Sequence, residues 1–180
     1  MSSLTSITSV ESRDDVLLRS LRKFYTDPTA LRTLTDVLRN KTKISLRTLD
    51  WLVTNYSKKN NVVYSYNNKT INVFLEYKGC LKAFSKRSFD PFQRRDRIEI
   101  TDADGEKLQS TTGQLNFFRF AISMGVIKYA TQNSTAIESD MLAAIKHRNT
   151  KGPKTKRKEL SKAAIKSATA TDIKVTVRFS

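Results

Sequence analysis

The chain has 180 residues, of which 33 are Lys or Arg and 17 are Asp or Glu, so its formal net charge is +16. The length fits one domain, no apolar run approaches the roughly 18 residues of a membrane-spanning helix, and the start lacks the regions of a secretory signal. A single cysteine excludes an intrachain disulfide and suits a reducing compartment. The charge predicts a polyanionic partner, which is nucleic acid, an acidic protein surface or a membrane face.

The first part of the chain is predicted to be helical. Residues 1–11 are rich in Ser and Thr and are interpreted as an arm. Helix starts are expected at Ser12, at Asp27-Pro28 and at Ser45, because these residues suit the N-cap or the first turn of a helix. Apolar residues follow each start at helical spacing, and Asn40 ends the second helix. The helices within residues 12–57 are expected to form a small bundle.

The hydrophobic period changes after residue 60. Residues 62–66 are rich in β-formers and residues 67–69 are typical of a turn, so we predict a hairpin whose second strand covers residues 71–75. Residues 78–86 are predicted to form a short helix, and residues 97–101 another strand.

A tight turn is expected at Asp102-Ala103-Asp104-Gly105, after which residues 107–109 pair back. Asp102 and Asp104 resemble the start of a calcium loop, but the further acidic ligands are missing, so the turn interpretation is preferred.

Residues 112–130 form the most apolar stretch, in which apolar side chains occupy most of the helical circumference. We predict one central buried helix here, started by a capping box between Thr111 and Gln114. Gly125 is expected to end or bend it. A further amphipathic helix is predicted over residues 135–147.

The last segment, residues 149–180, is predicted to dock on a core domain of residues 12–148. It begins with a basic linker that is broken at Gly152-Pro153 and continues into a helix-prone stretch. Residues 172–179 alternate strictly between apolar and polar, which is typical of a half-buried strand. The predicted fold class is therefore α+β, with N-terminal helices and a small, mainly antiparallel sheet that this C-terminal strand closes.

Two segments carry much of the positive charge: the middle basic segment, residues 82–97, and the C-terminal basic segment, residues 146–166. We predict that they contact a polyanion or an acidic partner through Lys86, Arg87, Arg94, Arg95, Arg97, Lys151, Lys154, Lys156, Arg157, Lys158 and Lys162. On nucleic acid such residues contact phosphates with little sequence specificity, and on a protein the arginine forks pair with carboxylates. The stretch TKRK, residues 155–158, also fits a nuclear-import signal.

The stretch SFDPFQRRDRIEI, residues 88–100, allows two interpretations. Phe89 and Phe92 would stack on bases if both were exposed beside the arginines. They flank Asp90-Pro91, however, which is a turn former. We therefore expect both aromatic rings to pack into the core and the arginines to remain available to a partner.

Residues suited to catalysis or metal binding are scarce. His147 has no carboxylate near it in the sequence to orient it as a base, and one His with Cys80 cannot supply a usual zinc ligand set. The motifs of phosphate, dinucleotide and acyl-transfer sites are missing. We predict no enzymatic activity, no metal and no cofactor, and we interpret Cys80 as a small buried apolar residue.

Four stretches together resemble a family of small basic proteins encoded by nucleocytoplasmic large DNA viruses. They are ISLRTLDWLVTNYSKKNNVVY, LKAFSKRSFDPFQRRDRIEI, TTGQLNFFRFAI, and KRKELSKAAIKS with the IKVTVRF that follows, and they span residues 43–179 approximately. The resemblance carries no catalytic residue. It implies a viral protein that is made in the host cytoplasm and is packaged in the virion or built into it.

From this resemblance we expect a non-enzymatic minor capsid or adaptor protein of a large icosahedral double-stranded DNA virus. It would bridge neighbouring capsid proteins through its basic surface and extended termini. The alternative is a nucleic-acid-binding protein that condenses or packages viral DNA.

Overall fold

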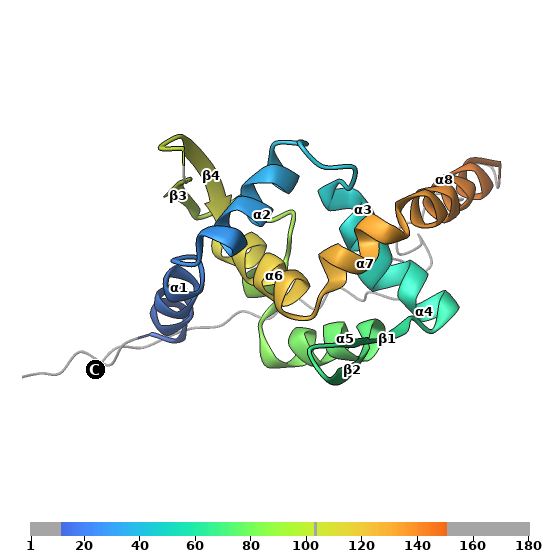
Figure 1. Ribbon diagram of the computed structural model, residues 1–180, viewed down its shortest axis with the longest axis horizontal. Coiled ribbons are helices and arrows are strands. Elements are labelled where there is room, and N and C mark those ends of the chain that lie inside the picture. Colours follow the sequence, from blue (N-terminus) through green and yellow to red (C-terminus); the bar gives the residue numbers. More distant parts are fainter. Residues whose placement is uncertain (1–11, 103, 151–180) are drawn as a thin grey trace, which may run out of the picture. The chain divides into compact units, whose positions relative to one another are not determined.

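The computed structural model describes residues 12–102 and 104–150 (Figure 1). The helices are α1 (Arg13–Phe24), α2 (Pro28–Leu38), α3 (Leu46–Trp51), the π-helical turn η1 (Leu52–Tyr56), α4 (Ser57–Asn60), α5 (Val73–Ala83), the 3-10 turn η2 (Lys86–Phe89), α6 (Thr112–Ser123), α7 (Val126–Gln132) and α8 (Ser134–Thr150). The strands are β1 (Val63–Tyr66), β2 (Lys69–Asn72), β3 (Arg97–Thr101) and β4 (Lys107–Thr111). The predicted α+β class is confirmed.

The chain divides after Leu142 into two compact units, and the second is described only over residues 143–150, the end of α8. The predicted arm, basic linker and C-terminal strand lie outside the described residues. None of the helices in residues 12–102 and 104–150 is both long and apolar enough to cross a membrane.

Side-chain caps set the starts of the first three helices. Ser12, Asp27 and Ser45 each accept a hydrogen bond from a backbone N–H in the first turn of α1, α2 and α3, as predicted. Asn40 follows α2 with a φ of 55°, the left-handed conformation that commonly ends a helix.

The prediction of a strand over residues 71–75 is wrong beyond Asn72. Asn67 and Asn68 both have positive φ and make a two-residue turn, so Tyr66 pairs directly with Lys69. β2 then ends at Asn72, whose side-chain oxygen accepts the N–H of Leu75 at 3.1 Å and caps α5. The alternation of apolar residues continued across this cap, although the backbone had already changed from strand to helix.

The strands form two separate antiparallel hairpins within the described chain, β1 with β2 and β3 with β4. In the second hairpin Arg97 pairs with Thr111 and Thr101 with Lys107, so the predicted return of the chain after residue 105 is confirmed. Asp102 holds the turn, since its backbone N–H donates to the carbonyl oxygen of Glu106 at 3.0 Å.

α6 lies at the centre of the core, where it contacts α1, α2, η2 and α7 (Figure 1). Five of its apolar side chains are at most 5% exposed: Leu115, Phe117, Phe118, Phe120 and Ala121. The central buried helix is therefore present, but it ends before Gly125, which has a φ of 70° and precedes α7.

Only half of the predicted capping box at α6 is present. The hydroxyl oxygen of Thr111 accepts the N–H of Gln114 at 3.2 Å. The side chain of Gln114 bonds instead to the hydroxyl of Ser110 and to the carbonyl oxygen of Pro91. This second bond ties the start of α6 to the middle basic segment.

Candidate functional site

The middle basic segment is anchored by one aromatic side chain. Phe89 is 1% exposed, and its ring contacts four others. The ring-centroid distances are 5.7 Å to Phe120, 5.8 Å to Phe84, 5.9 Å to Phe117 and 5.9 Å to Tyr77. The expectation that Phe89 packs into the core is confirmed.

The same expectation is wrong for Phe92, which is 47% exposed. The carboxylate of Asp90 accepts the N–H of Phe92 at 2.9 Å, and this local turn reverses the chain. Pro91 takes the buried position on the inner side of the turn. One aromatic residue therefore fixes the turn in the core and the other stands on the surface.

Backbone contacts hold η2 and the turn against α6. The side-chain amide of Asn116 donates to the carbonyl oxygen of Ser88 at 2.9 Å, and that of Gln114 donates to Pro91 at 3.1 Å. Gly113 allows the close approach, because a Cβ there would lie 2.6 Å from the carbonyl oxygen of Arg87. The segment is thus positioned by a rigid element, which favours a defined binding geometry.

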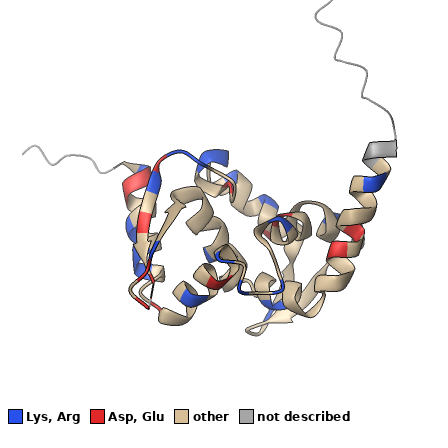
Figure 2. Ribbon diagram, turned by 90° about the horizontal axis from the view of Figure 1, so that it is seen from above, with Lys and Arg blue, Asp and Glu red and all other residues tan. Residues whose placement is uncertain are grey.

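The structure separates the five predicted cations of this segment into two groups. Arg87 pairs with Asp96, and Arg97 donates to the side-chain oxygen of Gln109 at 2.7 Å. Lys86, Arg94 and Arg95 are exposed and have no ion pair or hydrogen bond with another described side chain or backbone group. Lys and Arg occur on helices throughout the described chain (Figure 2). The unpaired cations of this segment stand on either side of a turn that is tied to α6 by the bonds to Ser88 and Pro91.

We call Lys86, Arg94, Arg95 and the exposed Phe92 the cationic ridge. Its members combine a point charge, two planar donor forks and one aromatic face. Such a set can hold carboxylates or phosphates.

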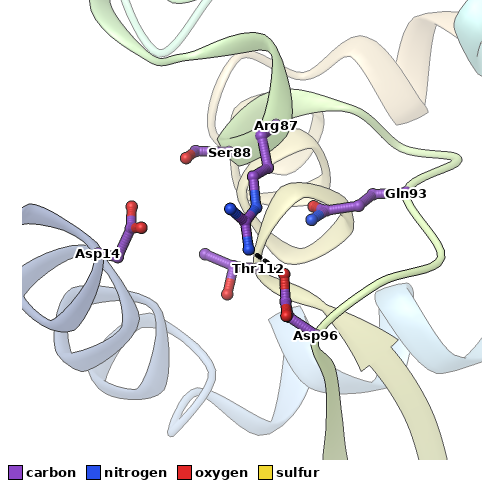
Figure 3. A pocket seen from close by; sticks show the side chains of 6 residues that line it. All are labelled: Asp14, Arg87, Ser88, Gln93, Asp96 and Thr112. Carbon is purple, nitrogen blue, oxygen red and sulfur yellow. Dashed lines mark hydrogen bonds and ion pairs between the residues drawn. The ribbon is translucent and has the colours of Figure 1, made fainter. Parts of the chain in front are cut away.

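Arg87 faces a small pocket in which acidic residues balance its charge (Figure 3). The hydrogen bond and the charge of Asp96 raise the pKa of Arg87, and the charge of Asp14 adds to this effect. Because Arg87 and Asp96 are both well exposed, the pair contributes little stability. Arg87 is therefore less available to a partner than Arg94 or Arg95.

An acidic cleft of about 400 Å³ is lined by residues of α3, α5, η2 and the turn after η2. Asp50, Tyr77 and Asp90 line it together with Lys86. Burial raises the pKa of Asp50, and the charge of Asp90 raises it further. Burial and these two carboxylates also raise the pKa of Tyr77. Sequence reasoning missed this grouping, since the three residues come from separate elements and no motif connects them.

The Asp50→Asn variant is expected to be more stable than the wild type at neutral pH. The folded pKa of Asp50 lies above its usual value of 3.8, so its contribution to stability is fully present below that value and is lost as the pH rises through the folded pKa. Among the described residues, no hydrogen bond or ion pair reaches this carboxylate to offset the loss.

Urea denaturation of both proteins between pH 3 and pH 8 measures this effect, because titrating groups that do not interact with Asp50 cancel in the difference. The stability difference should grow with pH and then level off. A variant that is less stable than the wild type at pH 7 would show that the ionised carboxylate has a favourable partner.

The other predicted site residues lie elsewhere. Lys151, Lys154, Lys156, Arg157, Lys158 and Lys162 are outside the described residues. His147 is exposed near the end of α8. Cys80 is half-buried against the core, and burial raises the pKa of its thiol. Within the described ranges, no group of three or more His, Cys, Asp or Glu could hold a metal ion.

Comparison with known proteins shows to which family the chain belongs. It matches the model of a family of unknown function, DUF7197, over residues 3–178. The chain belongs to the DUF7197 family. It is also 35% identical over 155 residues to "Uncharacterized protein L507" of Acanthamoeba polyphaga mimivirus. That match covers 81% of this chain but 60% of the mimivirus protein, so the chain spans less than two thirds of its relative's length.

No solved structure matches this DUF7197 chain. The mimivirus relative supports the predicted link to proteins of large DNA viruses. The names of the family and of the relative state no function.

Proposed function

We propose that this DUF7197 protein is a non-enzymatic structural component of the particle of a large icosahedral double-stranded DNA virus. It acts as an adaptor whose cationic ridge binds acidic faces of neighbouring particle proteins. The observation that carries the proposal is the set of unpaired cations, Lys86, Arg94 and Arg95, in the same segment as the exposed ring of Phe92. The viral relative supplies the context.

The exposure of the two aromatic residues favours a protein partner at this ridge. Proteins that bind single-stranded nucleic acid present several aromatic rings on which successive bases stack. Of the two aromatic residues in the described turn, Phe89 is buried and Phe92 is exposed. Exposed aromatic residues and arginines are typical of the residues that dominate binding at protein interfaces.

A second function, condensation of viral DNA, is favoured by the C-terminal basic segment. Residues 146–166 contain nine Lys or Arg and one acidic residue, Glu159. Phosphate contacts by these residues would give affinity that falls steeply with salt.

Binding of the full chain to duplex DNA across a salt series separates the two functions. The adaptor function predicts weak binding at near-physiological salt, unchanged when five residues of the C-terminal basic segment are replaced by alanine: Lys151, Lys154, Lys156, Arg157 and Lys158. A steep dependence on salt that flattens in this variant would overturn the adaptor proposal in favour of DNA packaging.

The adaptor function also predicts where the chain remains in a disrupted particle. After nuclease treatment it should stay with the protein shell, and the double variant Arg94→Ala, Arg95→Ala should be released. The matched control replaces Lys41 and Lys43 with alanine. Both lysines are exposed outside the ridge, and their replacement removes the same amount of charge. Equal release of both variants would show that net charge matters and that the ridge does not.

A further inference from the structure

A second cleft, of about 440 Å³, lies between α1 and the end of α5. Its walls include Val16 and Leu17 from α1 and Phe84 from the segment after α5, and we call it the α1 groove. Val16 is 47% exposed. The volume is within the roughly 300–1,000 Å³ of small-ligand sites. The groove thus offers apolar surface that α1 leaves uncovered.

Arg119 of α6 lines this groove and carries its half-buried positive charge. Its guanidinium donates to the hydroxyl oxygen of Ser20 at 3.0 Å and to the side-chain oxygen of Asn116 at 2.7 Å. The guanidinium carbon also lies 5.9 Å from the centre of the Phe84 ring. These contacts fix the plane of the fork, and they use two of the five N–H donors of an arginine.

No carboxylate in the described chain pairs with Arg119, since both hydrogen-bond partners are neutral. Asp14 also lines the groove, but its charge acts on Arg87. Burial lowers the pKa of Arg119, as expected for a cation that is partly removed from water without a counter-ion. A partly buried charge of this kind binds an incoming anion more strongly than an exposed lysine would.

We propose that the α1 groove binds an acidic segment of a partner protein, in which a Glu or Asp side chain lies next to an aliphatic residue. The carboxylate accepts hydrogen bonds from Arg119, and the aliphatic side chain packs against Val16, Leu17 and Phe84. Arg119 is the half-buried cation of the described lining, whereas Arg13 is exposed, so the buried charge fits a monoanion. The apolar walls fit the aliphatic neighbour.

The hydroxyls of the lining are neutral, so they add no positive charge to the groove. Ser85 and Ser88 are hydrogen-bonded to each other at 2.8 Å, and Ser20 accepts from Arg119. A phosphate would bring a second negative charge that no other half-buried cation of the described lining balances. This favours a carboxylate over a phosphate.

The proposal rests on the proposed function only in taking a protein as the partner. The groove and the cationic ridge share no residue, so variants of Arg119 and of Arg94 with Arg95 test them separately.

The probe is the blocked dipeptide N-acetyl-Leu-Glu-amide, and its matched control is N-acetyl-Leu-Gln-amide. NMR titration of the full chain should show saturable shifts at Arg119, Ser20 and Phe84 with the Glu peptide. The Gln peptide should bind about tenfold more weakly or worse, because it lacks the charge that strengthens the hydrogen bonds.

Two variants keep the test independent of folding. Arg119→Gln should weaken binding of the Glu peptide by about tenfold or more. Val16→Glu, at an exposed position in the first turns of α1, should weaken it as well by placing a negative charge at the groove. Equal binding of both peptides, shifts confined to Arg94 and Arg95, or tighter binding of hexanoate or inorganic phosphate would each overturn the proposal.

Discussion

Replacing Phe89 with alanine is expected to lower the free energy of unfolding by about 3–5 kcal/mol. The ring is 1% exposed and lies among four other aromatic rings. Its removal therefore leaves a cavity that the neighbouring side chains do not fill. The effect should extend to function, because Phe89 holds the turn that carries the cationic ridge. Equilibrium denaturation by urea, followed by circular dichroism, measures the change.

Phe92→Ala is the matched control. It also removes a phenyl ring, but Phe92 lies three residues further along the chain and its side chain is 47% exposed. Its effect on stability should stay within about 0.5 kcal/mol, as for ordinary surface substitutions. Under the proposed function it should weaken partner binding without unfolding the protein. Equal destabilisation by the two variants would contradict the central position assigned to Phe89.

Replacing Gly113 with alanine is expected to displace the middle basic segment from α6 and to cost about 1–3 kcal/mol of stability. The new Cβ would lie 2.6 Å from the carbonyl oxygen of Arg87 and 2.9 Å from that of Asp90. Backbone atoms cannot move aside as the end of a flexible side chain can. NMR shifts of the amides in residues 86–93, together with urea denaturation, measure both effects.

Gly79→Ala is the control for the intrinsic preference of a helix for alanine. Gly79 is exposed on α5, and a Cβ there would meet no atom within 4 Å. This variant should gain about 0.5–1 kcal/mol, because alanine loses less backbone entropy in a helix. If Gly113→Ala gained stability in the same way, η2 would not pack against α6 as closely as the structure shows.

Some features of this protein depend on local chemistry, and these were predictable from the sequence. Ser12, Asp27 and Ser45 start their helices because a side-chain oxygen satisfies a nearby backbone N–H wherever the chain lies in the fold. Gly125 ends α6 for a similarly local reason, its positive φ. The α+β class and the position of the central buried helix followed from hydrophobic period, which reports burial directly.

Features that depend on contacts between distant residues were decided only by the tertiary structure. Which of Phe89 and Phe92 is buried, the ion pair of Arg87 with Asp96, and the absence of a carboxylate partner for Arg119 in the described chain all depend on how separate segments of the chain meet. The same holds for Asp50, whose neighbour Asp90 is 40 residues away in the sequence.

The physical reason is the range of the interactions. Capping and periodicity act within a few residues, so the sequence by itself determined the starts of α1, α2 and α3, the core helix and the two basic segments. Ion pairing, burial of a charge and the shape of a groove arise between segments far apart in the chain. Only the tertiary structure could therefore decide which cations stay unpaired and where a partner can bind.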